Sequence, residues 1–239
     1  MRKWIGAAAI ASATVGGATA AHAEITANVA LASDYVFRGL SLTDSAPAIQ
    51  GGFDWNTEVF YAGVWGSSLA DGTEIDLYAG FTPTTGPVEW NIGAVGYFFP
   101  GADDDAAEFD FVEFVVAGSM SLTEQVSVGG GVYLTSENWG DTGEAAYYEI
   151  NGAYQPMDAL SFSAAYGNQT IEDPDGPLLV TGEDDYNTWN IGGTYAIHGF
   201  SLDLRYHDTD IDEGSAIEAY TFGPSSHDAT VVFTVGREL

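Results

Sequence analysis

Apolar and polar residues alternate along most of the chain from Glu24 onward. The first example places Ile25, Ala27, Val29 and Leu31 on one side of an extended segment. A period of two residues is typical of a β-strand with one apolar and one polar face. The pattern predicts about twelve strands of roughly ten residues, the length of a tilted strand that crosses a bilayer. The predicted strands are 24–37, 47–56, 58–68, 73–82, 87–98, 108–118, 124–135, 145–155, 159–168, 186–197, 199–208 and 228–238.

The connections between these strands are sorted by length. Short links follow the even-numbered strands, and long links, several of them acidic, follow the odd-numbered ones; examples of the long links are 100–107, 136–144, 169–185 and 209–227. Short turns on one rim and long loops on the other are typical of bacterial outer-membrane barrels. A soluble β-sandwich also alternates apolar and polar residues, but its topology does not sort loops in this way. We therefore expect residues 24–239 to form a closed antiparallel up-and-down transmembrane β-barrel, with both termini on the short-turn, periplasmic rim.

Aromatic residues lie near the ends of several predicted apolar bands. Rings in these positions fit the interfacial girdles of a membrane barrel. The candidates are Tyr35, Phe37, Trp55, Trp90, Phe98, Tyr154 and Tyr206. Ordinary packing is the alternative for any one of them.

The N-terminal segment has the features of a secretory signal. Arg2 and Lys3 precede an Ala-, Gly- and Val-containing run, and Ala21-His22-Ala23 has the small-x-small form of a cleavage site. We expect residues 1–23 to be removed near Ala23 and the barrel to reach the outer membrane through the periplasm. An N-terminal membrane anchor is the alternative, but the run is only weakly apolar and is broken by Ser and Thr.

The charge balance excludes several classes of partner. The formal net charge is −30, and after loss of the signal only Arg38, Arg205 and Arg237 remain as strong cations against 35 acidic residues. We expect no binding to nucleic acid through a basic patch. The chain has no Cys, so its stability must come from burial and strand pairing.

One motif resembles a known family. Residues 33–43 (SDYVFRGLSLT), followed by 47–54 (PAIQGGFD), resemble the opening of the TorF family of porins. The resemblance is motif-specific over about the first thirty residues after the signal and implies an outer-membrane barrel that forms a pore. The chain departs from the usual pattern of outer-membrane barrels at its end, which is Gly236-Arg237-Glu238-Leu239 instead of an aromatic residue. Arg237 interrupts the apolar face there and is expected to extend toward the lipid headgroups.

Charged side chains occupy many of the positions that alternate with the apolar ones, and these positions should point into the barrel. The predicted pore-lining residues are Arg38, Asp54, Glu74, Asp76, Glu89, Glu113, Glu149, Asp203 and Arg205. Carboxylates that line a lumen favour cations and oppose anions. We therefore expect passive diffusion of small solutes or ions with a cation preference, without catalysis and without a cofactor. The alternative is a non-conducting structural or adhesive barrel in which these charges neutralise one another and fill the lumen.

Arg38 has two predicted roles. It either contacts solutes or bridges inward carboxylates and closes the seam between the first and last strands.

Two further interpretations are weaker. Asp208, Asp210 and Asp212 have the spacing that begins an EF-hand loop. The match fails further on, because Glu213 stands where Gly is required and Ala219 where Glu is required. A solvated acidic loop is therefore the default interpretation, and no metal ligand is assigned. A hydrolase at the rim would use His207 or His227 with Ser225 or Ser226, although no motif fixes their spacing.

The expected partners are outer-membrane lipid and lipopolysaccharide, and homo-oligomerisation is left open.

Overall fold

The computed structural model describes residues 23–102, 109–172, 185–213 and 226–239. Twelve long strands form one closed antiparallel barrel. They are β1 (Glu24–Ala32), β4 (Ala48–Asn56), β5 (Phe60–Ser68), β6 (Thr73–Phe81), β8 (Val88–Phe98), β9 (Phe111–Ser121), β10 (Val126–Thr135), β11 (Ala145–Met157), β12 (Leu160–Ile171), β13 (Asp185–Ile197), β14 (Phe200–Thr209) and β15 (Thr230–Glu238). The described residues contain no helix with the length and hydrophobicity needed to cross a lipid bilayer.

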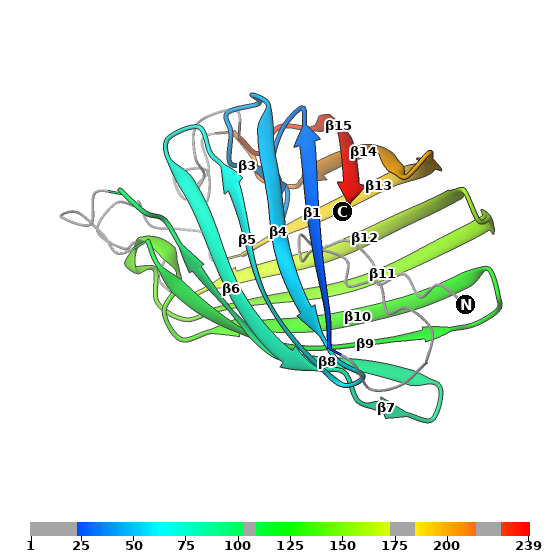
Figure 1. Cartoon of the computed structure of the whole chain (residues 1–239). Helices are drawn as coiled ribbons and strands as arrows, with labels where there is room; N and C mark the ends of the chain where they lie inside the picture. Colours follow the sequence, from blue (N-terminus) through cyan, green and yellow to red (C-terminus); the bar gives the residue numbers. More distant parts are fainter. Residues whose placement is uncertain (1–22, 103–108, 173–184, 214–225) are drawn as a thin grey trace.

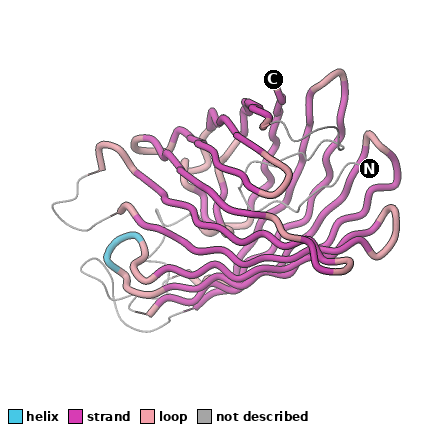
Figure 2. Tube along the Cα trace, turned by 60° about the horizontal axis from the view of Figure 1, so that its bottom comes forward, coloured by secondary structure: helices cyan, strands magenta, loops and turns pink. Residues whose placement is uncertain are grey.

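Each long strand pairs with its neighbours in the chain, and β15 returns to pair with β1 (Figure 1). The short β7 (Thr84–Thr85) extends the turn between β6 and β8, which also pair directly. In Figure 2 the strands run as a continuous wall, and the short 3-10 helix Trp139–Asp141 lies at one rim. The predicted barrel and its strand count are confirmed.

The two rims differ as the loop lengths predicted, with one exception. The links 57–59, 82–87, 122–125, 158–159 and 198–199 are short and share a rim with the chain ends, since Asn28 pairs with Glu238. The opposite rim carries 33–47 and 136–144, and also the links after β8, β12 and β14, which lie partly outside the described residues. Asp103–Asp105 and most of the predicted signal lie outside them too. The prediction of a long link after the third long strand is wrong, because only residues 69–72 separate β5 from β6.

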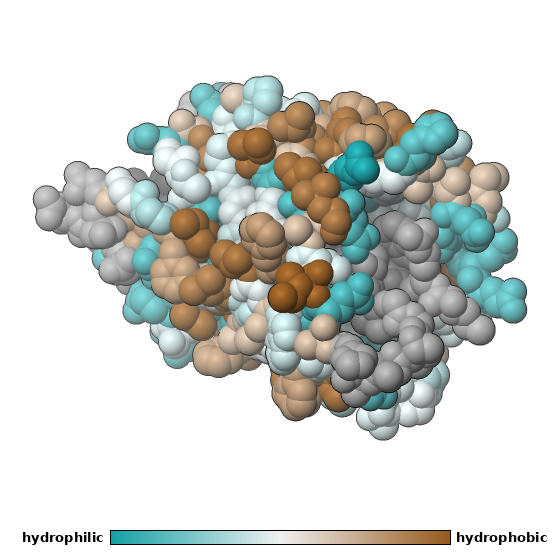
Figure 3. All heavy atoms as spheres, viewed as in Figure 1, coloured by the Kyte–Doolittle hydropathy of each residue, from teal (hydrophilic) through white to brown (hydrophobic). Residues whose placement is uncertain are grey.

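The outward face of the barrel is apolar, as the alternation predicted. Leu31 of β1 lies between Ile49 of β4 and Val235 of β15, and Leu31 and Ile49 are largely exposed. Apolar side chains gather over the strands on the face seen in Figure 3. The same face continues around the barrel through Leu77, Phe114, Ile150, Phe162, Ile191, Leu204 and Phe233.

Residues 33–47 do not continue the first strand, which ends at Ala32 and not at residue 37 as predicted. They fold inward and include the hairpin β2 (Val36–Phe37) and β3 (Leu40–Ser41). This inward hairpin segment packs in two apolar clusters against the inner barrel wall, one with Trp65, Tyr78, Val95, Tyr97 and Phe111 and the other with Ala145, Ile171 and Tyr186. The prediction of Tyr35 and Phe37 as interfacial rings is therefore wrong, because both pack in the first cluster inside the barrel.

Candidate functional site

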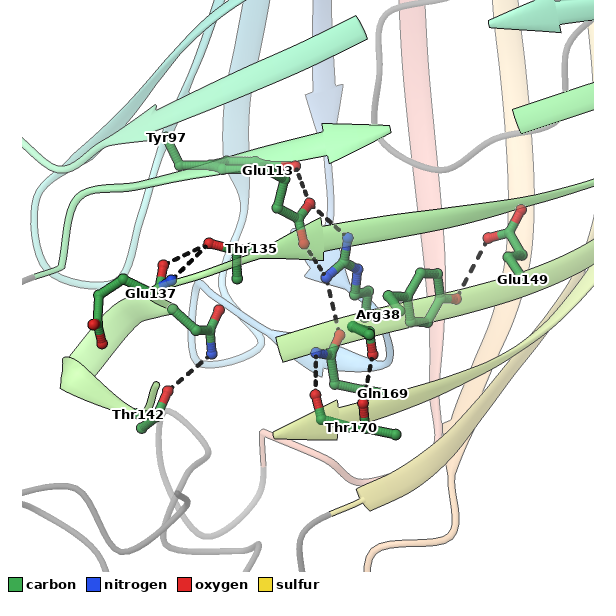
Figure 4. Close-up of polar contacts among 12 residues, drawn as sticks. Arg38, Tyr97, Glu113, Thr135, Glu137, Thr142, Glu149, Gln169 and Thr170 are labelled. Carbon is green, nitrogen blue, oxygen red and sulfur yellow. Dashed lines mark hydrogen bonds and ion pairs between the residues drawn. The ribbon is translucent and has the colours of Figure 1, made fainter. Parts of the chain in front are cut away.

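Arg38 lies at the tip of the inward hairpin and connects it to two strands of the wall (Figure 4). Its guanidinium donates two hydrogen bonds of 2.8 Å to the two carboxylate oxygens of Glu113 on β9. It donates a third bond of 2.9 Å to Oε1 of Gln169 on β12. Tyr97 adds a bond of 3.2 Å to Glu113. A planar guanidinium matches a carboxylate in this paired way, so the contact fixes both direction and distance.

The local sequence explains why Arg38 reaches this position. Arg38 and Gly39 form the two-residue turn between β2 and β3, with φ of 48° and 86°. Two positive φ angles are what a type I′ hairpin turn requires. The guanidinium carbon also lies 4.3 Å from the ring centre of Tyr147 and 5.3 Å from that of Tyr133. The tip is thus held by charge, hydrogen bonds and ring contacts together.

Arg38 keeps its charge although its side chain is buried. Burial works to lower the pKa of the guanidinium, but the Glu113 carboxylate more than reverses this and leaves the pKa raised. The side chain of Glu113 is only 2 % exposed and that of Arg38 is 9 % exposed. The contact between the two side chains is therefore almost fully removed from solvent.

Arg205 forms a separate network on the β12–β14 side of the lumen. It donates to Asn190 at 2.8 Å, to Ser163 at 3.0 Å and to Asp203 at 3.2 Å. Thr194 also donates to Asp203, at 2.7 Å. The predicted pairing of Arg205 with an inward acid is present, but Arg205 shares none of these partners with Arg38. The two arginines therefore belong to separate hydrogen-bond networks.

The remaining predicted pore-lining acids also lie on the inward face. Asp54 accepts a hydrogen bond from Tyr78, and Glu149 accepts one from Asn151 at 2.7 Å. Glu74 accepts one from Tyr35 at 3.1 Å. Glu89 is half-buried near the short-turn rim, opposite Ser119. Most of these contacts are to neutral donors, so the acids are not neutralised by arginine as a set.

The sequence did not predict the inward hairpin or its contacts with Gln169 and Tyr97 of the wall. The predicted bridging of inward carboxylates by Arg38 agrees with its contact to Glu113. The predicted closure of the seam by Arg38 is wrong, because the backbone ladder between β1 and β15 closes it. The pair Arg38-Gly39 between Val36-Phe37 and Leu40 was the available signal, since an x-Gly pair between apolar residues indicates a hairpin turn.

The residues of the hydrolase alternative are not joined by hydrogen bonds in the described part of the chain. Ser226 and His227 are buried near the loop rim, but Ser226 Oγ and His227 Nδ1 have no hydrogen-bond partner among the described residues. Ser225 lies outside the described residues. His198 lies in the turn between β13 and β14 and has a φ of 50°. No group of three or more metal-ligating side chains is found among the residues that the structure describes.

The closed antiparallel barrel is similar in fold to solved porin structures. The NanC porin is similar, with a TM-score of 0.58 at 8 % identity over 88 % of this chain and 97 % of that chain. A membrane protein from a study of in-meso crystallization gives 0.55 at 11 % identity over 91 % of this chain and 83 % of that chain. OccK5 (OpdH) of Pseudomonas aeruginosa gives 0.47 at 13 % identity, with coverage of 88 % of this chain and 62 % of that longer chain. At these low identities, the likeness to the first two structures establishes the fold alone.

The chain belongs to a family described as a bacterial protein of unknown function (Gcw_chp), whose model matches residues 16–239. No curated protein matches the sequence. The resemblance to the TorF family remains a prediction.

Proposed function

We propose that this chain is an outer-membrane channel for passive diffusion of small solutes, with a preference for cations. The observation that carries the proposal is the contrast between the two faces of the wall. The outward face is apolar, whereas the inward face carries the buried polar networks described above. Only a closed sheet satisfies the backbone of strands surrounded by lipid, and inward polar residues are typical of barrels that conduct.

The inward charges favour cations. The nine predicted lining residues comprise seven acids and two arginines, and each arginine is engaged by an acid. The acids in excess give the lumen a negative potential, which attracts cations and opposes anions. Solutes would pass the region beside the inward hairpin, where Arg38 and Glu113 fix the hairpin tip against the wall.

Conductance of the refolded chain in planar bilayers tests the pore. We expect discrete single-channel steps, with a reversal potential in a salt gradient that indicates cation preference. The triple variant Glu74→Gln, Asp76→Asn and Glu89→Gln should move this potential toward zero. Matched changes of the exposed turn acids Glu58 and Asp158 should leave it unchanged. Silence under conditions in which a known porin conducts would contradict the proposal.

A second candidate is a barrel that the inward hairpin keeps closed. The two apolar clusters on residues 33–47 favour it, because they fill lumen space with packed side chains. This alternative predicts silence in the bilayer at every pH. It also predicts that replacing 34–46 by a short Gly-Ser linker creates a conducting pore.

The proposal includes the cellular location. We infer export with removal of residues 1–23 and contact with outer-membrane lipid and lipopolysaccharide, supported by the sequence features of the leader and by the apolar outer face. Mass spectrometry of the mature chain from outer-membrane fractions tests this, and a first residue other than Glu24 would move the cleavage site.

A further inference from the structure

The wall that faces the inward hairpin contains two buried carboxyl groups side by side. Glu74 and Asp76 occupy alternate positions of β6, so both point into the lumen, and they are only 2 % and 3 % exposed. Side chains two positions apart on a strand project from the same face, so the two carboxyl groups are close neighbours. Two carboxylate oxygens are both acceptors and repel, so such a contact is attractive only when one carboxyl group carries a proton.

The part of the chain that the structure describes places no cation in a hydrogen bond or ion pair with Glu74 or Asp76. Tyr35 donates to Oε1 of Glu74, while Glu74 Oε2 and Asp76 Oδ1 have no other partner among the described residues. Among the described residues, the titratable groups that interact with the pair are Tyr35 from the hairpin segment, Tyr78 from β6, Tyr97 from β8 and Glu113 from β9. Arg38 is already paired with Glu113. Two charged carboxylates at this place would therefore remain uncompensated.

A proton fits this site better than a metal ion. Hard cations take about six or more oxygen ligands, and the described residues offer no group of three metal-ligating side chains. A shared proton needs only one oxygen from each carboxyl group, and each group has one buried oxygen without a hydrogen-bond partner among the described residues. Two carboxyl groups that share one proton are the expected result when like charges are forced together in a buried site.

We propose that Glu74 and Asp76 share one proton at neutral pH. This proton holds the inward hairpin segment against β6, so the passage through the lumen beside this segment depends on pH. The hairpin touches the pair through Tyr35, whose hydroxyl donates to Glu74. Burial, and then the charges of Glu74 and Asp76, raise the pKa of Tyr35, so this hydroxyl remains a donor as the pH rises. The shared proton is independent of conduction, whereas its effect on conductance rests on the proposed function.

The sign of the effect follows from the charge. Proton binding stabilises the packed arrangement at low pH, and this stabilisation is lost as the pH rises and the pair releases its proton. The resulting repulsion is relieved by entry of water. β6 is fixed by backbone bonds to β5 and β8, so the hairpin segment is the part that moves. Between about pH 5 and about pH 9 we expect conductance to rise about twofold or more.

Infrared spectroscopy of the full chain refolded in lipid detects the proton directly. We expect the carbonyl band of a protonated carboxylic acid at neutral pH and its loss at high pH. The band should disappear in both Asp76→Asn and Glu74→Gln but persist in Asp158→Asn, an exposed turn position. A wild-type barrel without this band at neutral pH, or a band that survives both lumenal substitutions, would overturn the shared proton.

Bilayer recordings on the same samples test whether the shared proton holds the hairpin segment against β6. Asp76→Asn keeps a hydrogen-bond donor to Glu74, so its conductance should be low and independent of pH, unlike that of the wild type. Equal pH dependence of conductance in the wild type and Asp76→Asn would overturn the claim that the shared proton holds the hairpin segment. A barrel that shows the infrared band but is silent at every pH retains the shared proton, and contradicts both the channel function and release of the hairpin.

Discussion

At the scale of single residues, Arg38 combines an unfavourable backbone with a favourable side-chain environment. A positive φ costs a residue other than Gly roughly 1–2 kcal/mol, and Arg38 has a φ of 48°. The bidentate contact to Glu113 and the bond to Gln169 are available only from this turn geometry. Strain that is held by a buried ion pair often marks a site of function, which agrees with a role in the proposed constriction.

Removal of Arg38 alone should be more harmful than removal of the whole pair. Arg38→Met leaves Glu113 buried without its cation, and we expect a loss of about 3–5 kcal/mol in the free energy of unfolding. The double variant Arg38→Met with Glu113→Gln leaves no unpaired charge and should recover much of that loss. Urea unfolding in lipid vesicles, followed by Trp fluorescence, measures both. Equal losses in the two variants would show that the uncompensated charge is not the cause.

The inward direction of the site residues could be predicted, but their partners could not. Strand parity was enough to place Glu113 and Arg205 on the lumenal face. The pairing of Arg38 with Glu113 and Gln169 joins positions that are 75 and 131 residues apart. It depends on a segment that leaves the wall, and an alternation of period two describes only residues that stay in it.

At the scale of elements, the structure differs from the sequence pattern at the inward hairpin, where the first strand ends earlier than the pattern predicts. Tyr35 and Phe37 keep the parity of the first strand, so the pattern alone extends that strand to residue 37. The structure ends the strand early because local bonds replace the ladder: Ser41 and Thr43 both donate to Asp34 at 2.7 Å, and the Tyr35 amide donates to Thr43. Short polar side chains compete with strand pairing in this way. The buried rings then make the inward position favourable.

The fit of the hairpin tip against the wall predicts the effect of Gly39→Ala. A Cβ on Gly39 would collide with Thr209 and Thr188, and the residue has a φ of +86°. We expect a destabilisation of about 2–4 kcal/mol from strain and overpacking together. The displaced hairpin should also raise single-channel conductance.

Gly86→Ala is the matched control for this substitution. Gly86 also has a positive φ, of +61°, but a Cβ there meets nothing within 4 Å. It should lose only about 1 kcal/mol and leave conductance unchanged. Equal effects at the two glycines would mean that the packing of the tip is unimportant.

At the scale of the whole molecule, the topology was predictable because neighbouring strands in the barrel are also neighbours in the sequence. Each antiparallel strand is joined to the next by a short or a long link, so strand order follows directly from chain order. The pairing of β1 with β15 then follows from the need to leave no open edge in lipid. The contents of the lumen follow from no such rule, because one inward loop can pack in many ways.

The outer face permits a test of the solvent around the barrel. Ile150 lies in the middle of β11 and is 68 % exposed, whereas Ile25 lies near the start of β1 and is 74 % exposed. If lipid surrounds the barrel, Ile150→Arg should cost about 2–4 kcal/mol and Ile25→Arg only about 0–1 kcal/mol, since the cost depends on depth in the bilayer. In water both substitutions would be nearly neutral, because an exposed arginine is well solvated. Reversible urea unfolding of each variant in vesicles gives the two values, and equal costs at the two positions would contradict a barrel that spans a membrane.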